Sequence, residues 1–85
     1  MGEIMNNGIN FKRGAKIIDI QDKYNYQLYH VPGAVNIPYD ELMNNYRNYL
    51  NKNETYYIYC KSGKLSKRVV MVLSYLGYSV VSLEK

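Results

Sequence analysis

Apolar residues along this chain fall into short continuous runs that alternate with longer segments in which they recur every three or four positions. Short runs rich in β-branched and aromatic residues predict buried strands, whereas the longer recurrence predicts amphipathic helices. The expected strands cover residues 16–20, 34–37, 55–59 and 78–83.

Polar residues and glycine mark where the helices between these strands begin and end. Asp22 and Asp40 stand where a carboxylate can accept hydrogen bonds from the free N–H groups of a first helical turn, so both are expected N-caps. Gly77 follows the last apolar residue of the third helical segment and is expected to end it. Helices are therefore predicted at residues 22–30, 40–50 and 65–76.

Strands and helices that alternate over short connections predict an α/β fold with a small, mostly parallel sheet flanked by helices. At 85 residues, of which 47% are hydrophobic, the chain can form one modest core. We therefore expect residues 1–85 to form a single domain with a poorly defined lead-in at 1–15. The longest strictly apolar run, 69–73, is too short to cross a membrane, and the first residues do not form a secretion signal. A cytoplasmic protein with no membrane partner is the resulting expectation.

Cys60 lies where the predicted strand at 55–59 meets a glycine-containing loop that leads into a helix. Such a loop directs unpaired backbone N–H groups into one concavity, and the helix dipole adds partial positive charge. This environment binds anions and favours a thiol in its reactive thiolate form. The alternative is a buried apolar cysteine that only ends a strand. The candidate nucleophile is Cys60, and the candidate anion-binding loop is Lys61, Ser62, Gly63, Lys64, Leu65 and Ser66.

Positive charge is concentrated beside this cysteine. The net charge of the chain is +4, and residues 55–83 contain no carboxylate side chain. Lys61 and Lys64 are the basic residues expected to attract an anion to the loop. Lys67 and Arg68 are interpreted instead as part of a solvated helix face.

Residue counts disfavour other classes of site. One cysteine cannot form an internal disulfide, and one cysteine with one histidine is too few for a zinc cluster, so neither a metal nor a cofactor is predicted. Eleven tyrosines in a basic chain suggest nucleic-acid binding, but Tyr57 and Tyr59 fall in a predicted core strand rather than on a basic surface. Redox and nucleophilic chemistry at the thiol both stay open at this point.

Three segments together resemble the single-domain rhodanese-like sulfurtransferases over about residues 16–83. The run that ends at Ile20 is similar to the family's opening strand, although an arginine that commonly follows it is here Gln21. The segment HVPGAVNIP at 30–38 closely matches the family's second signature. The resemblance implies framework roles, in the strand or in a structural turn, for Asp19, His30, Pro32 and Gly33.

Residues 59–66 are similar to the family's active-site loop, whose cysteine takes up a sulfane sulfur and holds it as a persulfide. The resemblance implies that Cys60 accepts sulfur from a small anionic donor such as thiosulfate and passes it to a thiol or cyanide without a cofactor. It also argues against a catalytic pair of Cys60 and His30. Leu65 stands where many relatives carry an arginine, so one side-chain contact to the donor is expected to be absent.

The residues of the cysteine loop also bear on two other functions. Related phosphatases and arsenate reductases clamp an oxyanion with an arginine six positions after the cysteine, where this chain has Ser66, which disfavours that chemistry. A non-catalytic module that carries a persulfide or binds a partner stays open.

The family usually continues beyond the equivalent of residues 82–85, so this end of the chain is expected to be abbreviated, and the front end is expected to be abbreviated as well. A shorter helical cover would leave more of the sheet exposed. This predicts either a marginally stable monomer or association through the exposed face.

Overall fold

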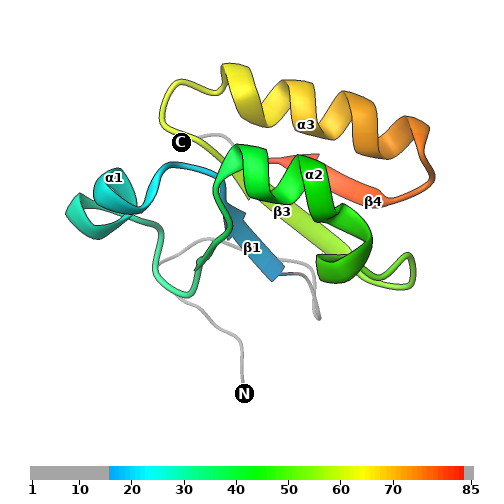
Figure 1. Cartoon of the computed structure of the whole chain (residues 1–85), viewed down its shortest axis with the longest axis horizontal. Coiled ribbons are helices and arrows are strands. Elements are labelled where there is room, and N and C mark those ends of the chain that lie inside the picture. The colour runs from blue at the N-terminus through cyan, green and yellow to red at the C-terminus, as the bar shows by residue number, and fades with distance from the viewer. Residues whose placement is uncertain (1–15, 84–85) are drawn as a thin grey trace.

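The computed structural model describes residues 16–83, and their strands form a single parallel sheet. The elements follow one another as β1 (Lys16–Asp19), α1 (Lys23–Leu28), β2 (Val35–Asn36), α2 (Tyr39–Tyr49), β3 (Thr55–Tyr59), α3 (Lys64–Tyr75) and β4 (Ser79–Ser82). The strand order is β2-β1-β3-β4, and every neighbouring pair is parallel. The α/β fold and its mostly parallel sheet are thus confirmed (Figure 1). The predicted lead-in at 1–15 lies outside the described residues.

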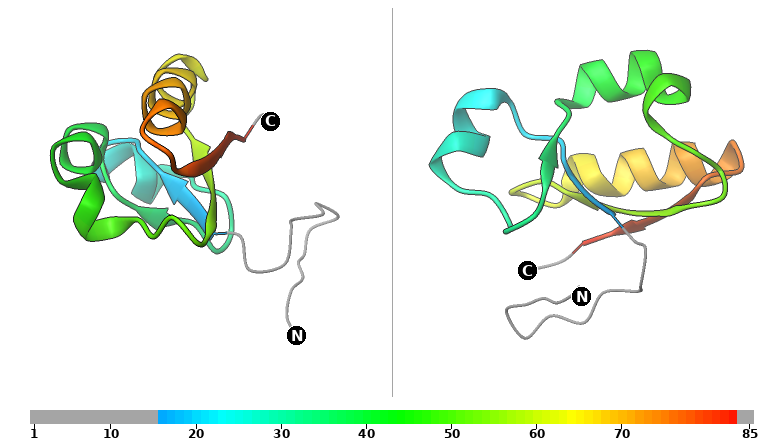
Figure 2. Two further views of the ribbon diagram at one scale, coloured as in Figure 1. Left: turned by 90° about the vertical axis from the view of Figure 1, so that its right-hand side faces the viewer. Right: turned by 90° about the horizontal axis from the view of Figure 1, so that it is seen from below.

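One face of the sheet is covered by α2 and α3. Ile58 on β3 is fully buried and packs in one cluster with Leu42 of α2 and with Val69 and Leu73 of α3. Their spacing puts these side chains on the inner face of each helix, as the recurrence of apolar residues predicted. The two helices and the strands are seen from further directions in Figure 2.

The opposite face carries a smaller cluster built around Ile17 and Tyr59. Val31 and Ala34, from the segment between α1 and β2, cover these two side chains. A turn positions that segment: the N–H of Ala34 donates to the carbonyl of Val31 at 2.9 Å, and Gly33 has φ +89°. A residue with a side chain adopts that φ only with strain, which explains a glycine here.

Helix starts were predicted correctly at one of two sites. Asp22 caps α1, because its Oδ1 accepts a hydrogen bond from the Asn25 N–H at 2.9 Å. The prediction that Asp40 caps the next helix is wrong: α2 begins at Tyr39, its N-cap is Pro38, and Asp40 lies inside the first turn. Proline fits a helix start because its missing N–H and restricted φ cost little there. The third helix ends as predicted before Gly77, which has φ +98°.

The carboxyl ends of β1 and β3 meet at one edge of the sheet, where backbone hydrogen bonds join the segments that follow the strands. The N–H of Ile20 donates to Tyr59 O at 2.9 Å, and the N–H of Tyr39 donates to Ile20 O at 3.0 Å. Ligands of parallel sheets bind at this edge.

Among residues 16–83, the helices are all too short and too polar to span a bilayer.

Candidate active site

The sulfur of Cys60 accepts two backbone hydrogen bonds from its own loop. Cys60 directly follows β3 and is buried. The N–H of Gly63 lies 3.1 Å from Sγ, and the N–H of Ser66, in the first turn of α3, lies 3.2 Å from it. Gly63 has φ +82°, and this left-handed conformation turns the chain so that both amides face the same atom. The Gly63 and Ser66 amides therefore form a small anion-stabilising cradle around the Cys60 sulfur.

These contacts lower the pKa of Cys60 below its ordinary value. Burial of the sulfur raises the pKa, but hydrogen bonds from the backbone N–H groups of Ser66 and Gly63, together with the nearby Ser66 and Ser62 hydroxyls, outweigh it. A hydrogen bond to the charged form favours ionisation. The basic side chains of the described residues are not among these causes, so the amides and hydroxyls stabilise the thiolate.

Ser66 connects this cradle to the last strand. It is fully buried, and its hydroxyl donates to the carbonyl of Gly63 at 3.1 Å. Its Oγ also lies 3.0 Å from the Oγ of Ser82 on β4. Ser82 was not found from the sequence, because nothing in the pattern of a short terminal strand marks one serine as a neighbour of the loop. The hydroxyl pair fixes the residue that supplies one of the two sulfur-facing amides.

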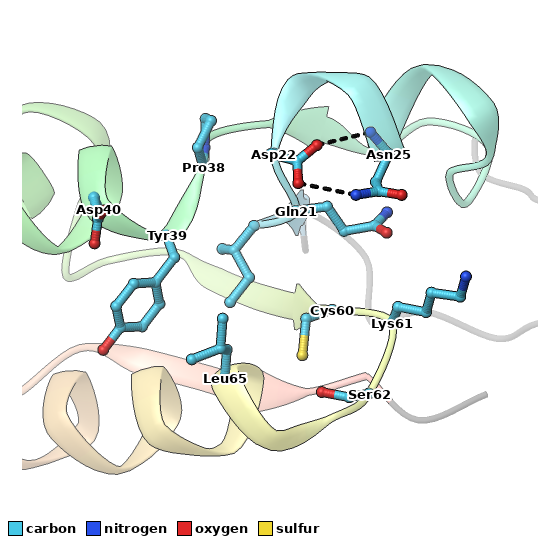
Figure 3. A pocket seen from close by; sticks show the side chains of 11 residues that line it. Gln21, Asp22, Asn25, Pro38, Tyr39, Asp40, Cys60, Lys61, Ser62 and Leu65 are labelled. Carbon is cyan, nitrogen blue, oxygen red and sulfur yellow. Dashed lines mark hydrogen bonds between the residues drawn. The ribbon is translucent and has the colours of Figure 1, made fainter.

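A pocket of about 700 Å³ opens in front of Cys60 (Figure 3). The segments that follow β1, β2 and β3 all contribute to its lining. Of the predicted loop residues, Cys60, Lys61, Ser62 and Leu65 line the pocket. Gly63 and Ser66 contribute through their amides instead, and Lys64 is exposed in the first turn of α3.

The pocket also contains residues that sequence reasoning did not assign to it, notably Ile20, Tyr39 and Asp40. Ile20 was predicted as a strand residue, and Asp40 only as a helix cap. Ile20 directly follows β1, and Tyr39 and Asp40 lie in the first turn of the helix after β2, which was the available signal. Strand order was required to show that these segments lie beside Cys60.

Asp19 is fully buried, and Gln21 donates hydrogen bonds to its carboxylate. Its Oδ1 accepts from the backbone N–H of Gln21 at 2.8 Å, and its Oδ2 accepts from the Gln21 side-chain amide at 2.9 Å. The same amide group donates to Tyr29 O at 3.3 Å. Gln21 therefore joins the end of β1 to the end of α1, beside the pocket that it also lines.

His30 lies in the turn region and does not line the Cys60 pocket. Its Nδ1 is 2.8 Å from the carbonyl of Tyr26, and its ring stacks on the Tyr26 ring with 3.8 Å between centroids. Pro32 and Gly33 form the exposed corner of the adjacent turn. Among residues 16–83, no group of His, Cys, Asp and Glu side chains is arranged to hold a metal ion.

Comparison with known proteins places this geometry in a family. A model of the rhodanese-like domain matches residues 4–85. The chain is 38% identical over 72 residues to a tRNA sulfurtransferase of Pyrobaculum aerophilum, covering 85% of this chain and 15% of that protein. It is 37% identical over 65 residues to the thiosulfate sulfurtransferase PspE of Escherichia coli, covering 75% of this chain and 62% of that protein.

Structural similarity leads to the same family. A solved structure of a rhodanese with anions from E. coli is 35% identical to this chain, with a TM-score of 0.68, and the match covers 80% of this chain and 81% of that one. The sequence match spans nearly the whole chain, and the fold agrees with it. The chain belongs to the rhodanese-like family.

Proposed function

We propose that this protein is a sulfurtransferase that carries a sulfane sulfur on Cys60 as a persulfide. The observation that carries the proposal is the pair of amides, from Gly63 and Ser66, on the Cys60 sulfur. They favour a thiolate before reaction and can stabilise the anionic terminal sulfur of a persulfide afterwards. Two curated relatives are named sulfurtransferases, which supports the same class of reaction.

The reaction has two nucleophilic steps at sulfur. The Cys60 thiolate attacks the outer sulfur of thiosulfate or a similar donor, the donor S–S bond breaks, and sulfite leaves with the bonding pair. A thiolate or cyanide then attacks the outer sulfur of the Cys60 persulfide. The second S–S bond breaks, Cys60 leaves as thiolate, and the acceptor becomes a persulfide or thiocyanate. Each step transfers one neutral sulfur atom and needs no external oxidant, reductant or cofactor.

The second candidate function is to carry a persulfide without rapid turnover of thiosulfate. One feature of the pocket lining favours it. Leu65, rather than a cation, stands beside Cys60, and Lys61 is the basic residue among the lining side chains. A small dianion therefore meets few charged donors outside the backbone cradle. The protein would then receive sulfur from another persulfide more readily than from thiosulfate.

Oxyanion chemistry of the phosphatase type has no support in the loop. Ser66 occupies the position expected for a clamping arginine, is fully buried, and directs its hydroxyl to Gly63 O. Arg68 is exposed two residues further along α3 and does not line the pocket. A serine hydroxyl cannot reproduce the two parallel hydrogen bonds of a guanidinium.

The loading step is tested by intact-protein mass spectrometry after incubation with thiosulfate. We expect the mass of one added sulfur atom, its removal by dithiothreitol, and no addition to Cys60→Ser, which lacks the chain's one thiol. The same incubation with an organic persulfide tests loading from a different donor. An unmodified mass with both donors would contradict the proposal.

Turnover separates an enzyme from a carrier. Thiocyanate release from thiosulfate and cyanide is compared with sulfur transfer from the preloaded protein to small thiols. Steady thiocyanate production that is lost in Cys60→Ser supports the enzyme. Loading followed by transfer to thiols, with little thiocyanate, supports the carrier.

A further inference from the structure

The charge on the pocket wall is opposite to the charge that the loop sequence predicted. The charged side chains among the lining residues are Lys61, Asp22 and Asp40. Lys61 follows β3, whereas the two carboxylates come from the segments after β1 and β2. The wall that faces the cysteine loop is therefore acidic. Local sequence did not predict this charge, because it depends on how the sheet brings these segments together.

The three charged side chains of the pocket differ in their direction and in their hydrogen-bond partners. The Lys61 side chain extends away from the sulfur in Figure 3. Both Asp22 oxygens accept hydrogen bonds from Asn25, at 2.9 Å each, and these bonds hold the pKa of the carboxyl below its usual range. Within residues 16–83 the exposed Asp40 carboxylate has no hydrogen-bond or ion-pair partner, although it lines the pocket. Of the two pocket carboxylates, Asp40 is thus the one with no hydrogen-bond partner among the described residues.

An apolar surface separates Asp40 from the reactive sulfur. Leu65 and the ring of Tyr39 lie between them in Figure 3, and Ile20 lines the same part of the pocket. Leu65 remains 41% exposed, so a ligand can still cover its side chain. A molecule with its sulfur at Cys60 and its body over Leu65 would extend toward the Asp40 carboxylate.

We infer that this pocket selects sulfur acceptors whose thiol is borne on an apolar stem with a positively charged group. The inference rests on the proposed function, since it concerns the second substrate of that reaction. The acceptor thiolate attacks the outer sulfur of the Cys60 persulfide, and Cys60 leaves as thiolate. The apolar stem covers Leu65 and Tyr39, and the cation lies toward Asp40. An anionic acceptor of the same size is repelled by the same carboxylate.

A structural role for Asp40 is the competing explanation, because carboxylates in a first helical turn stabilise the helix dipole. Glu41 provides the matched control. It lies in the same first turn of α2, does not line the pocket, and accepts a hydrogen bond from the Tyr49 hydroxyl. Asp40→Asn and Glu41→Gln each remove one negative charge from that turn, but only Asp40→Asn removes it from the pocket.

The first experiment does not require sulfur transfer. The Cys60 thiol is modified with methanethiosulfonates that share one reacting group and carry a trimethylammonium, a neutral alkyl or a sulfonate substituent. Comparing each variant with the wild-type protein for the same reagent cancels the intrinsic reactivity of that reagent. We expect Asp40→Asn to slow the cationic reagent and to speed the anionic one by about two- to fivefold at low salt. Both effects should shrink at high salt, and Glu41→Gln should match the wild type.

The second experiment measures sulfur transfer from the preloaded Cys60 persulfide to three thiols that share one six-carbon alkyl stem and end in an ammonium, a hydroxyl or a carboxylate. Asp40→Asn should reduce the rate for the ammonium thiol relative to that for the carboxylate thiol by a similar factor. If the protein cannot be loaded, the proposed function fails, while the methanethiosulfonate rates still report on the pocket. Equal effects of Asp40→Asn and Glu41→Gln, or changes of the same sign for both charged reagents, would overturn the inference.

Discussion

The hydroxyl of Ser82 on β4 lies 3.0 Å from the hydroxyl of Ser66, whose own N–H faces the Cys60 sulfur at 3.2 Å. The last strand of the sheet is thereby joined to the reactive loop through one buried side chain. If Ser82 donates to Ser66, the Ser66 hydroxyl keeps its proton for the Gly63 carbonyl or for the sulfur. A residue outside the pocket would then help to set the reactivity of the thiol.

Ser82→Ala should raise the pKa of Cys60 toward its ordinary value, because Ser66 loses a partner that orients it. We expect alkylation by iodoacetamide at neutral pH to slow by about threefold, corresponding to a fraction of one pKa unit. Stability should fall by about 1 kcal/mol for the lost hydrogen bond. The pH dependence of the alkylation rate reports the change in the Cys60 pKa, and urea unfolding reports the change in stability.

Ser79→Ala is the control for this change, because Ser79 is on the same strand and pairs with the Thr55 hydroxyl at 3.1 Å, away from the loop. Ser82→Thr retains a hydroxyl and should recover part of the wild-type profile. A Ser82→Ala profile that overlays that of the wild type would show that the hydroxyl pair has no effect on the thiol.

The wild-type protein should itself show an unusually acidic thiol. The pKa of Cys60 is lowered in the folded protein, and the deprotonated form is the one that reacts. The alkylation rate should therefore rise with pH through a midpoint below that of an ordinary cysteine and then level off. In urea, where the Gly63 and Ser66 amides are no longer held at the sulfur, the midpoint should move upward. Equal midpoints in the two states would contradict the amide cradle.

Gly63→Ala should damage both stability and reactivity. A Cβ built at this position meets no atom within 4 Å, so the cost comes from the left-handed backbone at φ +82°. That conformation costs an alanine about 1–2 kcal/mol. Relaxation of the strain would move the Gly63 N–H away from Sγ, so alkylation at neutral pH should slow several-fold. The measurements are urea unfolding and alkylation kinetics.

Gly33→Ala gives a closely matched control, since Gly33 has φ +89° and equally open space around its Cβ position. Its turn lies outside the Cys60 loop. We expect a similar loss of stability with unchanged thiol reactivity. Comparable slowing of alkylation in both variants would mean that general destabilisation, rather than the position of the amide, controls the thiol.

Gln21→Ala should destabilise the fold through Asp19. The substitution removes the side-chain donor to Oδ2 of a carboxyl group that is fully buried. A buried polar atom left without its partner costs about 1–3 kcal/mol. Urea unfolding should show this loss, whereas Gln27→Ala, at an exposed position of α1, should change stability little. A loss no greater than that of Gln27→Ala would show that Asp19 does not depend on this amide.

Local sequence determined most of the secondary structure because its causes are short-ranged. The run at 55–59 became β3 with the predicted bounds, and Asp22 caps α1 through a residue only three positions away. The placement of Cys60 between a strand and a helix start is also local, since it needs only the strand, the glycine and the following apolar recurrence. The Asp40 cap was wrong because Pro38 starts that helix without a side-chain cap.

Tertiary structure decided which chemistry surrounds the thiol. The order β2-β1-β3-β4 places the segments after β1 and β2 beside the cysteine loop, which brings the Asp40 carboxylate to a pocket that local sequence had predicted to be basic. The same order brings Ser82 to Ser66, sixteen positions apart in the chain. These contacts depend on how strands pair across the sheet, and hydrophobic periodicity fixes which face of a strand is buried but not which strands are neighbours.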